Sequence, residues 1–271
     1  MSQYIHGTDA DEQRRLSRLN DLLNEASLAR LSPHPGEHVL DVGSGLGQLS
    51  RAIARRVGRE GRVVGIERSD EQRAGAAQRA AEDGEAGLVD FRPGDATALP
   101  LAEVEWGRFD VAHTRFLLEH VPDPLAVVRE MVRAVRPGGR VVLMDDDHDV
   151  LRLHPEPPGF SVLWQAYIRS YDRLGCDPYV GRRLVALLHA AGARPTAASG
   201  IFYGGAAGTP EFETAGHNIV RIMRGARAAL TAPGMLEVET FERAVGALEG
   251  WLARPDASCW YSLCWAEGRK P

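Results

Sequence analysis

A glycine-rich turn between an apolar run and a helix restricts the fold of this chain more than any other feature. Residues 38–42 are short, apolar and rich in valine, which is typical of a parallel strand buried on both faces. Gly43, Gly45 and Gly47 follow at alternate positions. Glycine permits positive φ and, lacking a Cβ, lets a ligand lie directly against the main chain. Apolar side chains then recur at helical spacing over 49–57, so the sequence predicts a strand, a ligand-binding turn and a helix N-terminus.

A second predicted strand, 62–66, is followed by the acidic residue Glu67, twenty residues after Gly47. A carboxylate at that place can accept hydrogen bonds from both hydroxyls of a bound ribose. The turn and this acid therefore indicate a nucleoside-bearing cofactor. The dinucleotide fingerprint G-x-G-x-x-G would need glycine where this chain has Gln48 or Ser50. A nicotinamide-dependent oxidoreductase is accordingly the least favoured enzyme class.

Strand-like and helix-like segments alternate over 37–149, as expected for a parallel sheet with helices on both faces. We predict a doubly wound, mostly parallel, seven-stranded α/β sheet with helical cap insertions. The predicted strands include 38–42, 62–66, 109–114, 140–145, 197–203 and 258–266, and the predicted helices of the core are 47–58, 70–83, 124–135 and 181–192. We expect an N-terminal helical cap segment, 1–36, and one core domain, 37–271, with lid insertions at about 150–179 and 209–253.

Composition limits the classes of function. The 271 residues are 44% hydrophobic and 25% charged, which is enough apolar material for one large core. The net charge is −5 and the basic residues are scattered, so the electrostatic footprint of a nucleic-acid-binding protein is missing. No apolar stretch reaches the roughly eighteen residues of a membrane span, and we expect a cytoplasmic protein. Cys176, Cys259 and Cys264 are too few for a disulfide framework.

Five short motifs add a resemblance to a known enzyme class. They are residues 39–47, 65–68, 94–96, 109–121 and 136–140. In this order they resemble the class I S-adenosylmethionine-dependent methyltransferases, and within that class the chain looks most like the ubiquinone/menaquinone C-methyltransferase-like group. The resemblance is strong over 37–149 and covers the rest only in general layout. It implies a Rossmann-like fold, S-adenosyl-L-methionine as cofactor and a small-molecule acceptor.

The resemblance also implies which residues bind the cofactor. Those around its methionine part are Asp41, Gly43, Ser44, Gly45 and Gly47. Those around its nucleoside are Glu67 on the ribose, with Arg68, Asp95 and Ala96 beside the adenine. Under its amino acid and sulfonium lie Thr114 and Arg115, while the N-terminal segment folds over the cofactor with Tyr4.

Several of these residues have ordinary structural alternatives. Asp41 could simply cap the turn, and Arg115 could pair with Glu119 four residues on. His113 points to the opposite face of its strand from the next residue, which favours a packed or surface histidine. The group often carries two histidines where this chain has Glu119 and His120, which leaves the role of that pair open.

A base is needed in methyl transfer only when the acceptor must lose a proton. His148, within the acidic run 144–149, is the candidate catalytic base. Its intrinsic pKa is suitable, and neighbouring carboxylates would raise that pKa and orient the ring. The same aspartates and histidine could alternatively bind a divalent ion or form a solvated loop. We predict no metal.

Aromatic residues outside the core suggest the nature of the acceptor. The candidates for the substrate pocket are His6, Tyr167, Tyr171, Phe202 and Tyr203, although aromatic side chains at helical spacing are also typical of a packed core. An aromatic wall favours methylation of a small, largely apolar acceptor, either quinone-like or a secondary metabolite. The alternatives are C-methylation of a prenyl chain or ring and, from another class, a catalytically silent cofactor-binding module. The acceptor, the methylated atom and the oligomeric state, including a homodimer, are left open.

Overall fold

The computed structural model describes residues 23–271, which form two compact units. The helical unit comprises the described residues 148–178 and 202–262, and the sheet unit comprises 23–147, 179–201 and 263–271. The insertions expected at about 150–179 and 209–253 make up most of the helical unit. Tyr4, His6 and most of the expected N-terminal cap segment lie outside the described residues.

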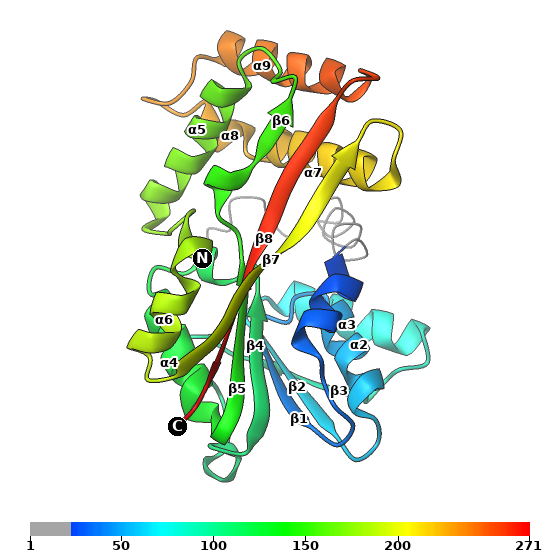
Figure 1. Ribbon diagram of the computed structural model, residues 1–271, viewed down its shortest axis with the longest axis vertical. Helices are drawn as coiled ribbons and strands as arrows, with labels where there is room; N and C mark the ends of the chain where they lie inside the picture. Colours follow the sequence, from blue (N-terminus) through cyan, green and yellow to red (C-terminus); the bar gives the residue numbers. More distant parts are fainter. Residues whose placement is uncertain (1–22) are drawn as a thin grey trace. The chain divides into compact units, whose positions relative to one another are not determined.

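The sheet has eight strands in the order β3-β2-β1-β4-β5-β8-β6, with β7 paired to β8 (Figure 1). The strands are β1 (His38–Val42), β2 (Arg62–Glu67), β3 (Val89–Pro93), β4 (Phe109–Arg115), β5 (Val135–Asp145), β6 (Arg152–His154), β7 (Arg194–Ala206) and β8 (Ser258–Arg269). Strands β1 to β5 pair in parallel, whereas β8 is antiparallel to β5 and β6. The predicted mostly parallel α/β sheet is confirmed, and β6 is an additional short strand.

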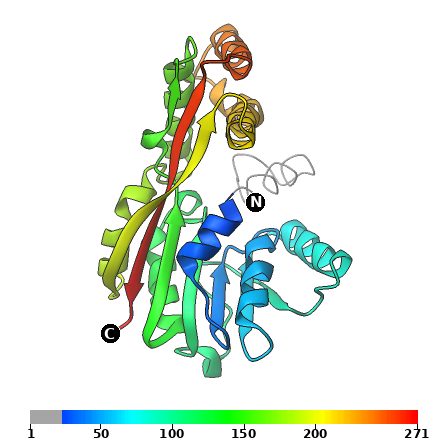
Figure 2. The ribbon, with the colours of Figure 1, turned by 45° about the vertical axis from the view of Figure 1, so that its right-hand side comes forward.

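Helices cover both faces of the sheet unit (Figure 2). They are α2 (Gln48–Val57), α3 (Asp70–Glu82), α4 (Pro124–Ala134) and α6 (Leu184–Ala190). Helices α2 and α3 lie on one face, and α4 and α6 lie on the other. Val39, Leu40 and Val42 of β1 are all fully buried, which explains why that strand is apolar at successive positions and not alternating. The central strands therefore form the core from which the turns at their carboxyl ends project.

The helical unit contains α5 (Phe160–Ser170), α7 (Pro210–Gly225), α8 (Arg227–Leu230) and α9 (Val238–Leu252). Helix α5 packs on α8 and α9, and α7 also packs on α9. Gly216 allows α7 to approach α9, because a Cβ there would lie 2.4 Å from Cδ2 of Leu252. The apolar stripes of these helices are buried, including Phe212 and Phe241, which confirms their helical spacing in the sequence. Short 3-10 turns are η1 (Glu103–Glu105), η2 (Leu118–His120), η3 (His148–Val150), η4 (Tyr171–Leu174) and η5 (Val180–Arg183).

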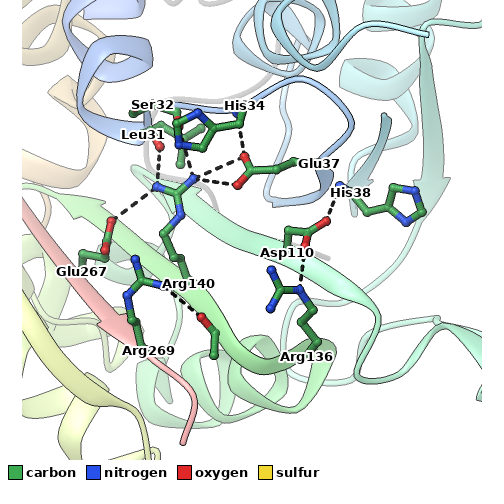
Figure 3. A network of polar contacts seen from close by, with 11 residues as sticks. Leu31, Ser32, His34, Glu37, His38, Asp110, Arg136, Arg140, Glu267 and Arg269 are labelled. Atoms are coloured by element: carbon green, nitrogen blue, oxygen red, sulfur yellow. Dashed lines mark hydrogen bonds and ion pairs between the residues drawn. The ribbon is translucent and has the colours of Figure 1, made fainter. Parts of the chain in front are cut away.

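Arg140 of β5 fixes the helix of residues 23–31 to the sheet (Figure 3). Its guanidinium donates to the carbonyl oxygens of Leu31 at 2.8 Å and Ser32 at 3.3 Å. It also forms ion pairs with Glu37 at 3.3 Å and Glu267 at 3.5 Å. Only 11% of the Arg140 side chain is exposed, so this network is an interior joint of the sheet unit.

Two further features concern membrane-spanning helices and cysteines. In the described part of the chain, no helix has the length and apolar character required to cross a membrane. None of the three cysteines, Cys176, Cys259 and Cys264, which all lie among the described residues, forms a disulfide. Burial raises the pKa of Cys259 to about 12, so this thiol stays protonated at neutral pH.

Candidate cofactor and acid–base sites

The glycine turn after β1 has a backbone that only glycine adopts easily. The φ angles are +79° at Gly43, +54° at Gly45 and +70° at Gly47. A Cβ on Gly47 would lie 2.4 Å from Cζ of Phe91, so space as well as conformation excludes a side chain there. The N–H of Gly43 donates to the carbonyl oxygen of Ile66 at 2.9 Å, which draws the turn against the end of β2. The predicted tight turn is confirmed.

Glu67 at the end of β2 is tied directly to this turn. The N–H of Gly45 donates to Glu67 Oε2 at 2.9 Å, and the N–H of Ser69 donates to Oε1 at 2.7 Å. The side chain is only half-buried. Each carboxylate oxygen can accept more than one hydrogen bond, so Glu67 can still receive the hydroxyls of a ribose. The acid therefore has a structural role in addition to the expected binding role.

Ser44 takes a different position from its glycine neighbours. Its hydroxyl is buried and has no hydrogen-bond partner among residues 23–271. It packs toward β2, because a Cβ on Gly65 would lie 3.0 Å from its Oγ. The main chain of Ser44, whose N–H donates to Ile66 at 3.0 Å, forms the turn, while its side chain fills the space over Gly65.

Asp41 belongs to a buried polar cluster under the turn. The hydroxyl of Ser50, on α2, donates to Asp41 Oδ2. Nε2 of His113 lies 3.3 Å from Oδ1, within ion-pair distance but outside hydrogen-bond geometry. Burial by itself would raise the pKa of Asp41, but His113, Ser50 and Arg115 together lower it. His113 is 1% exposed, as expected for a packed histidine. The hydroxyl that donates to Asp41, that of Ser50, belongs to helix α2 and not to the glycine turn.

Arg115, at the end of β4, is bound to the helix of residues 23–31. Its guanidinium donates to the Ser27 hydroxyl and to the Asn24 side-chain oxygen, both at 2.9 Å. These partners differ from Glu119, the alternative that the four-residue spacing suggested. Burial lowers the pKa of Arg115 to about 10, and nearby Asp41 opposes that shift. Arg115 therefore remains a cation at neutral pH in an interior position.

Thr114 precedes Arg115 and is fully buried. Its hydroxyl donates to the carbonyl oxygen of Val42 at 2.8 Å, which ties β4 to the start of the glycine turn. Its described contact is therefore structural, and a direct contact with a cofactor stays a prediction.

The expected adenine-binding residues lie at the ends of β2 and β3. Asp95 accepts hydrogen bonds from the N–H of Thr97 at 2.8 Å and from its hydroxyl at 2.6 Å. These two bonds lower the pKa of Asp95 against a smaller effect of burial, and Arg68, 4.0 Å away, lowers it further. Asp95 and Arg68 are exposed and Ala96 is half-buried, so this edge can receive a planar base.

Carboxylates at the end of β5, from the acidic run 144–149, are buried in the structure. Asp145 is fully buried, and its Oδ2 accepts from the N–H groups of Leu117 at 3.1 Å and Leu118 at 2.7 Å. Burial and the neighbouring acids Glu119 and Asp146 raise the pKa of Asp145 well above its ordinary value. These hydrogen bonds join β5 to the turn after β4. They depend on how β4 and β5 are paired in the sheet, so the sequence by itself does not indicate them.

Asp147 and Arg182 form the next contact along the chain. Two guanidinium nitrogens of Arg182 lie 2.6 Å and 2.7 Å from the two carboxylate oxygens. This fork-shaped pair fixes η5 beside the end of β5. Asp145 and Asp147 are thus engaged by groups of the sheet unit, and an effect of neighbouring carboxylates on His148 stays a prediction.

His148, the candidate base, is buried in the helical unit among aromatic side chains. Its Nδ1 is hydrogen-bonded to the hydroxyl of Tyr261 at 2.7 Å, and its Nε2 to that of Tyr171 at 3.2 Å. The hydroxyls of Tyr171 and Tyr167 are 2.9 Å apart. Trp164 Nε1 donates to the His148 carbonyl oxygen at 2.7 Å. Tyrosine hydroxyls therefore orient the ring, and Tyr261 is a member of the site that sequence reasoning missed.

The other pocket candidates divide between this cluster and the surface. Tyr167 and Tyr171 are each 1% exposed, and the Tyr203 ring lies 4.9 Å from the Tyr261 ring between centroids. Phe202 is 55% exposed and contacts Trp260, also exposed, at a centroid distance of 5.5 Å. Three candidates are thus brought together and Phe202 is not. Their role as a substrate pocket stays a prediction.

The turn fits the cofactor that the motifs implied. Three glycine positions hold bare main chain, and α2 begins directly after Gly47 with no side-chain cap. A helix N-terminus attracts carboxylate or phosphate groups, and Glu67 provides a ribose acceptor beside it. Asp41, Gly43, Gly45, Glu67 and the exposed Asp95 are thus suitably placed in one unit.

Comparison with known proteins agrees with this geometry. Residues 40–143 match the family described as methyltransferase domain. A ubiquinone biosynthesis O-methyltransferase of Pseudomonas aeruginosa is 38% identical over 151 residues, which are 56% of this chain and 57% of the relative. A 2-phytyl-1,4-naphtoquinone methyltransferase of Synechococcus elongatus is 36% identical over 111 residues, 41% of this chain and 46% of the relative. The chain spans about half the length of the curated relatives it matches.

Solved structures extend the fold comparison to nearly the whole chain. The geranyl diphosphate C-methyltransferase of Streptomyces coelicolor A3(2), in complex with Mg²⁺, geranyl diphosphate and S-adenosyl-L-homocysteine, has a TM-score of 0.56 at 14% identity. The match covers 97% of this chain and 85% of that protein. In its fold and ordered motifs the chain is similar to the class I S-adenosylmethionine-dependent methyltransferases, and its residues 40–143 match a methyltransferase domain. Its curated relatives within that class include methyltransferases of quinone biosynthesis.

Proposed function

We propose that this protein transfers the methyl group of S-adenosylmethionine to a small, largely apolar acceptor of the quinone-like or secondary-metabolite type. The observation that carries the proposal is the hydrogen bond from Gly45 N–H to Glu67, which joins the glycine turn to the ribose-binding acid. The matched methyltransferase domain and the names of the quinone-methylating relatives support it. Aromatic residues of the helical unit, among them Tyr203 and Tyr261, are consistent with an apolar acceptor.

The residues of the chain have separate tasks in this reaction. When bound, S-adenosylmethionine supplies an electrophilic methyl group. The main chain of Gly43, Gly45 and Gly47 would hold its methionine part, Glu67 its ribose and Asp95 its adenine. Methyl transfer is an in-line displacement, so positioning the two reactants and excluding water account for most of the acceleration. A residue that moves a proton is required only for a phenol, alcohol or carbon acid.

C-methylation of a prenyl chain or ring is the second candidate. The fold similarity to a geranyl diphosphate C-methyltransferase over 97% of this chain favours its inclusion. A cofactor-binding module without transfer activity is the candidate from another class, because a fold by itself does not define an activity. Release of S-adenosylhomocysteine in the presence of quinol or isoprenoid diphosphate acceptors distinguishes the three. We further propose that the protein is cytoplasmic. We also propose that it does not act on nucleic acid, which is consistent with its net charge of −5.

The experiment that tests the cofactor assignment is calorimetric titration of the full chain with S-adenosylhomocysteine. A hydrogen bond to a charged group contributes roughly 1.5–3 kcal/mol, so Glu67→Ala is expected to weaken binding by about tenfold to a hundredfold. The control is Glu82→Ala, which removes an exposed acid that accepts from Gln78 on α3. Unchanged affinity in Glu67→Ala would refute the ribose assignment.

A further inference from the structure

Helix α3 begins with a serine followed three residues later by a glutamine, which is the pattern of a capping box. In that motif the serine side chain accepts from the N–H of the fourth residue, whose own side chain reaches back to the N–H of the serine. The first bond is present, because Gln72 N–H donates to the Ser69 hydroxyl at 3.2 Å. In place of the second, Ser69 N–H donates to Glu67 Oε1 at 2.7 Å. Glu67 therefore takes the capping role that the Gln72 side chain would otherwise have.

The side-chain amide of Gln72 lies against the glycine turn instead. A Cβ on Gly45 would be 3.3 Å from Gln72 Oε1, and within the described chain no other atom beyond the residues adjoining Gly45 comes within 4 Å of that point. Gln72 is half-buried, and among residues 23–271 its amide has no hydrogen-bond partner. The fold thus holds a donor and an acceptor at the turn without using either, so both are available to a ligand.

Gly45 connects this amide with the acid that is expected to bind the ribose. The N–H of Gly45 donates to Glu67 Oε2 at 2.9 Å, while the side of Gly45 on which a Cβ would project faces the Gln72 amide. All three residues belong to the sheet unit, so their arrangement is set within one compact body. A carboxylate from the end of β2 and an amide from the first turn of α3 therefore meet at one main-chain residue of the turn.

The two side chains complement each other toward a hydroxyl group. An ionised carboxylate only accepts, and of its roughly four lone-pair sites the N–H groups of Gly45 and Ser69 use two at Glu67. The remaining sites can accept from the two hydroxyls of a ribose. A hydroxyl that donates to Glu67 still has an oxygen that accepts, and a glutamine amide supplies two N–H donors. Rotation about the last bond of the Gln72 side chain exchanges its oxygen and nitrogen, which brings a donor to the same place.

We propose that the Gln72 amide donates a hydrogen bond to a ribose hydroxyl of S-adenosylmethionine, and that the same hydroxyl donates to Glu67. This inference rests on the proposed methyl transfer and deepens it, because it makes Gln72 a specificity-determining residue for a ribose over a deoxyribose. Capping of α3 by Glu67 is what leaves the amide available for the cofactor. Glu67 thus both accepts from the ribose and gives the ribose its second protein partner.

The test is calorimetric titration of the full chain with S-adenosylhomocysteine and with its 2′-deoxy and 3′-deoxy analogues. Gln72→Met keeps the length of the side chain and removes the amide. A hydrogen bond between uncharged groups corresponds to about twofold to tenfold in affinity, so this variant is expected to bind S-adenosylhomocysteine more weakly by that factor. With at least one deoxy analogue, the one that lacks the contacted hydroxyl, the variant and the unaltered protein should bind equally. The matched control is Gln78→Met, which changes an exposed glutamine of the same helix and should leave all three affinities unchanged.

Unchanged affinity of Gln72→Met for S-adenosylhomocysteine would overturn the assignment of Gln72 and leave the proposed function intact. An equal loss with all three ligands would overturn it as well, because the amide would then act on something other than a ribose hydroxyl. Absence of binding by the unaltered protein would refute the proposed function together with this inference. Urea unfolding adds an independent measurement. The midpoint of Gln72→Met should equal that of the unaltered protein, and a lower midpoint would contradict an amide that the fold does not use.

Discussion

Replacing Gly47 by alanine tests the claim that the glycine turn is set by both conformation and space. At a φ of +70°, an alanine costs about 1–2 kcal/mol. The added Cβ would also lie 2.4 Å and 2.8 Å from two ring carbons of Phe91 and 3.1 Å from Cβ of Ala76. Ring and helix must both shift, and overpacking of this kind costs roughly 1–3 kcal/mol. The expected loss in the free energy of unfolding is therefore about 2–5 kcal/mol.

Gly84 provides the matched control for this variant. It has the same φ of +70° and lies in the same unit, but a Cβ there would meet nothing within 4 Å. Gly84→Ala is thus expected to lose only the conformational part, about 1–2 kcal/mol. Urea-induced unfolding of both variants measures the difference, and calorimetry with S-adenosylhomocysteine should show weaker binding only for Gly47→Ala. Equal destabilisation of the two variants would refute the role assigned to Phe91.

Two further predictions concern ion pairs of the sheet unit. Arg140→Ala leaves two carboxylates and two carbonyls of an interior network without their cation, so a loss of roughly 3–5 kcal/mol is expected in urea unfolding. Arg136→Ala, which removes a half-exposed partner of Asp110, should cost at most about 1 kcal/mol, and a similar cost for both would contradict the interior placement. Hydrogen bonds from Arg92 lower the pKa of Glu105 to about 2 against an opposing effect of burial, so the stabilisation by this acid is present above its ordinary pKa of 4.5 and disappears as the pH falls toward 2. The stability difference between the unaltered protein and Glu105→Gln, on the order of 1 kcal/mol at pH 7 after screening by solvent, should accordingly vanish by about pH 2, and a constant difference would exclude the pair as its source.

The bounds of a strand could be predicted where the local sequence pattern agrees with the pairing of that strand in the sheet. Strand β1 has the predicted bounds, because a short run with Val39, Leu40 and Val42 directly before a glycine turn leaves little alternative. Strand β5 was predicted to begin at residue 140 but begins at Val135. The strand includes the proline-glycine segment of residues 137–139, which resembles the end of a helix followed by a turn. The register explains the difference, as Phe109 pairs with Val135 while Val111 pairs with Arg140, so the extra residues form an irregularity. The three-residue β6 is too short to show any periodicity.

The candidate site was predictable only where its residues are neighbours in sequence. The glycine turn and Glu67 follow from one motif and one spacing. The buried pair of Asp41 and His113 depends on the register of two parallel strands, in which these residues are directly opposite. Tyr261 is even more distant from its partner His148, and no local pattern marks it. Side-chain contacts between remote segments require the packed structure, because a helical or strand period identifies a face but not what lies against it.

The hydrogen bonds of Glu67 bear on the rate at which the protein exchanges S-adenosylhomocysteine for S-adenosylmethionine. Both N–H groups that donate to this carboxylate come from the chain itself, so contacts within the protein define the shape of the turn. Ordering one backbone residue costs about 1–2 kcal/mol, and here that entropy is lost during folding. Preformed loops bind without a separate reorganisation step. The exchange of S-adenosylhomocysteine for S-adenosylmethionine should therefore follow single-exponential kinetics, with a rate limited by the dissociation of S-adenosylhomocysteine alone.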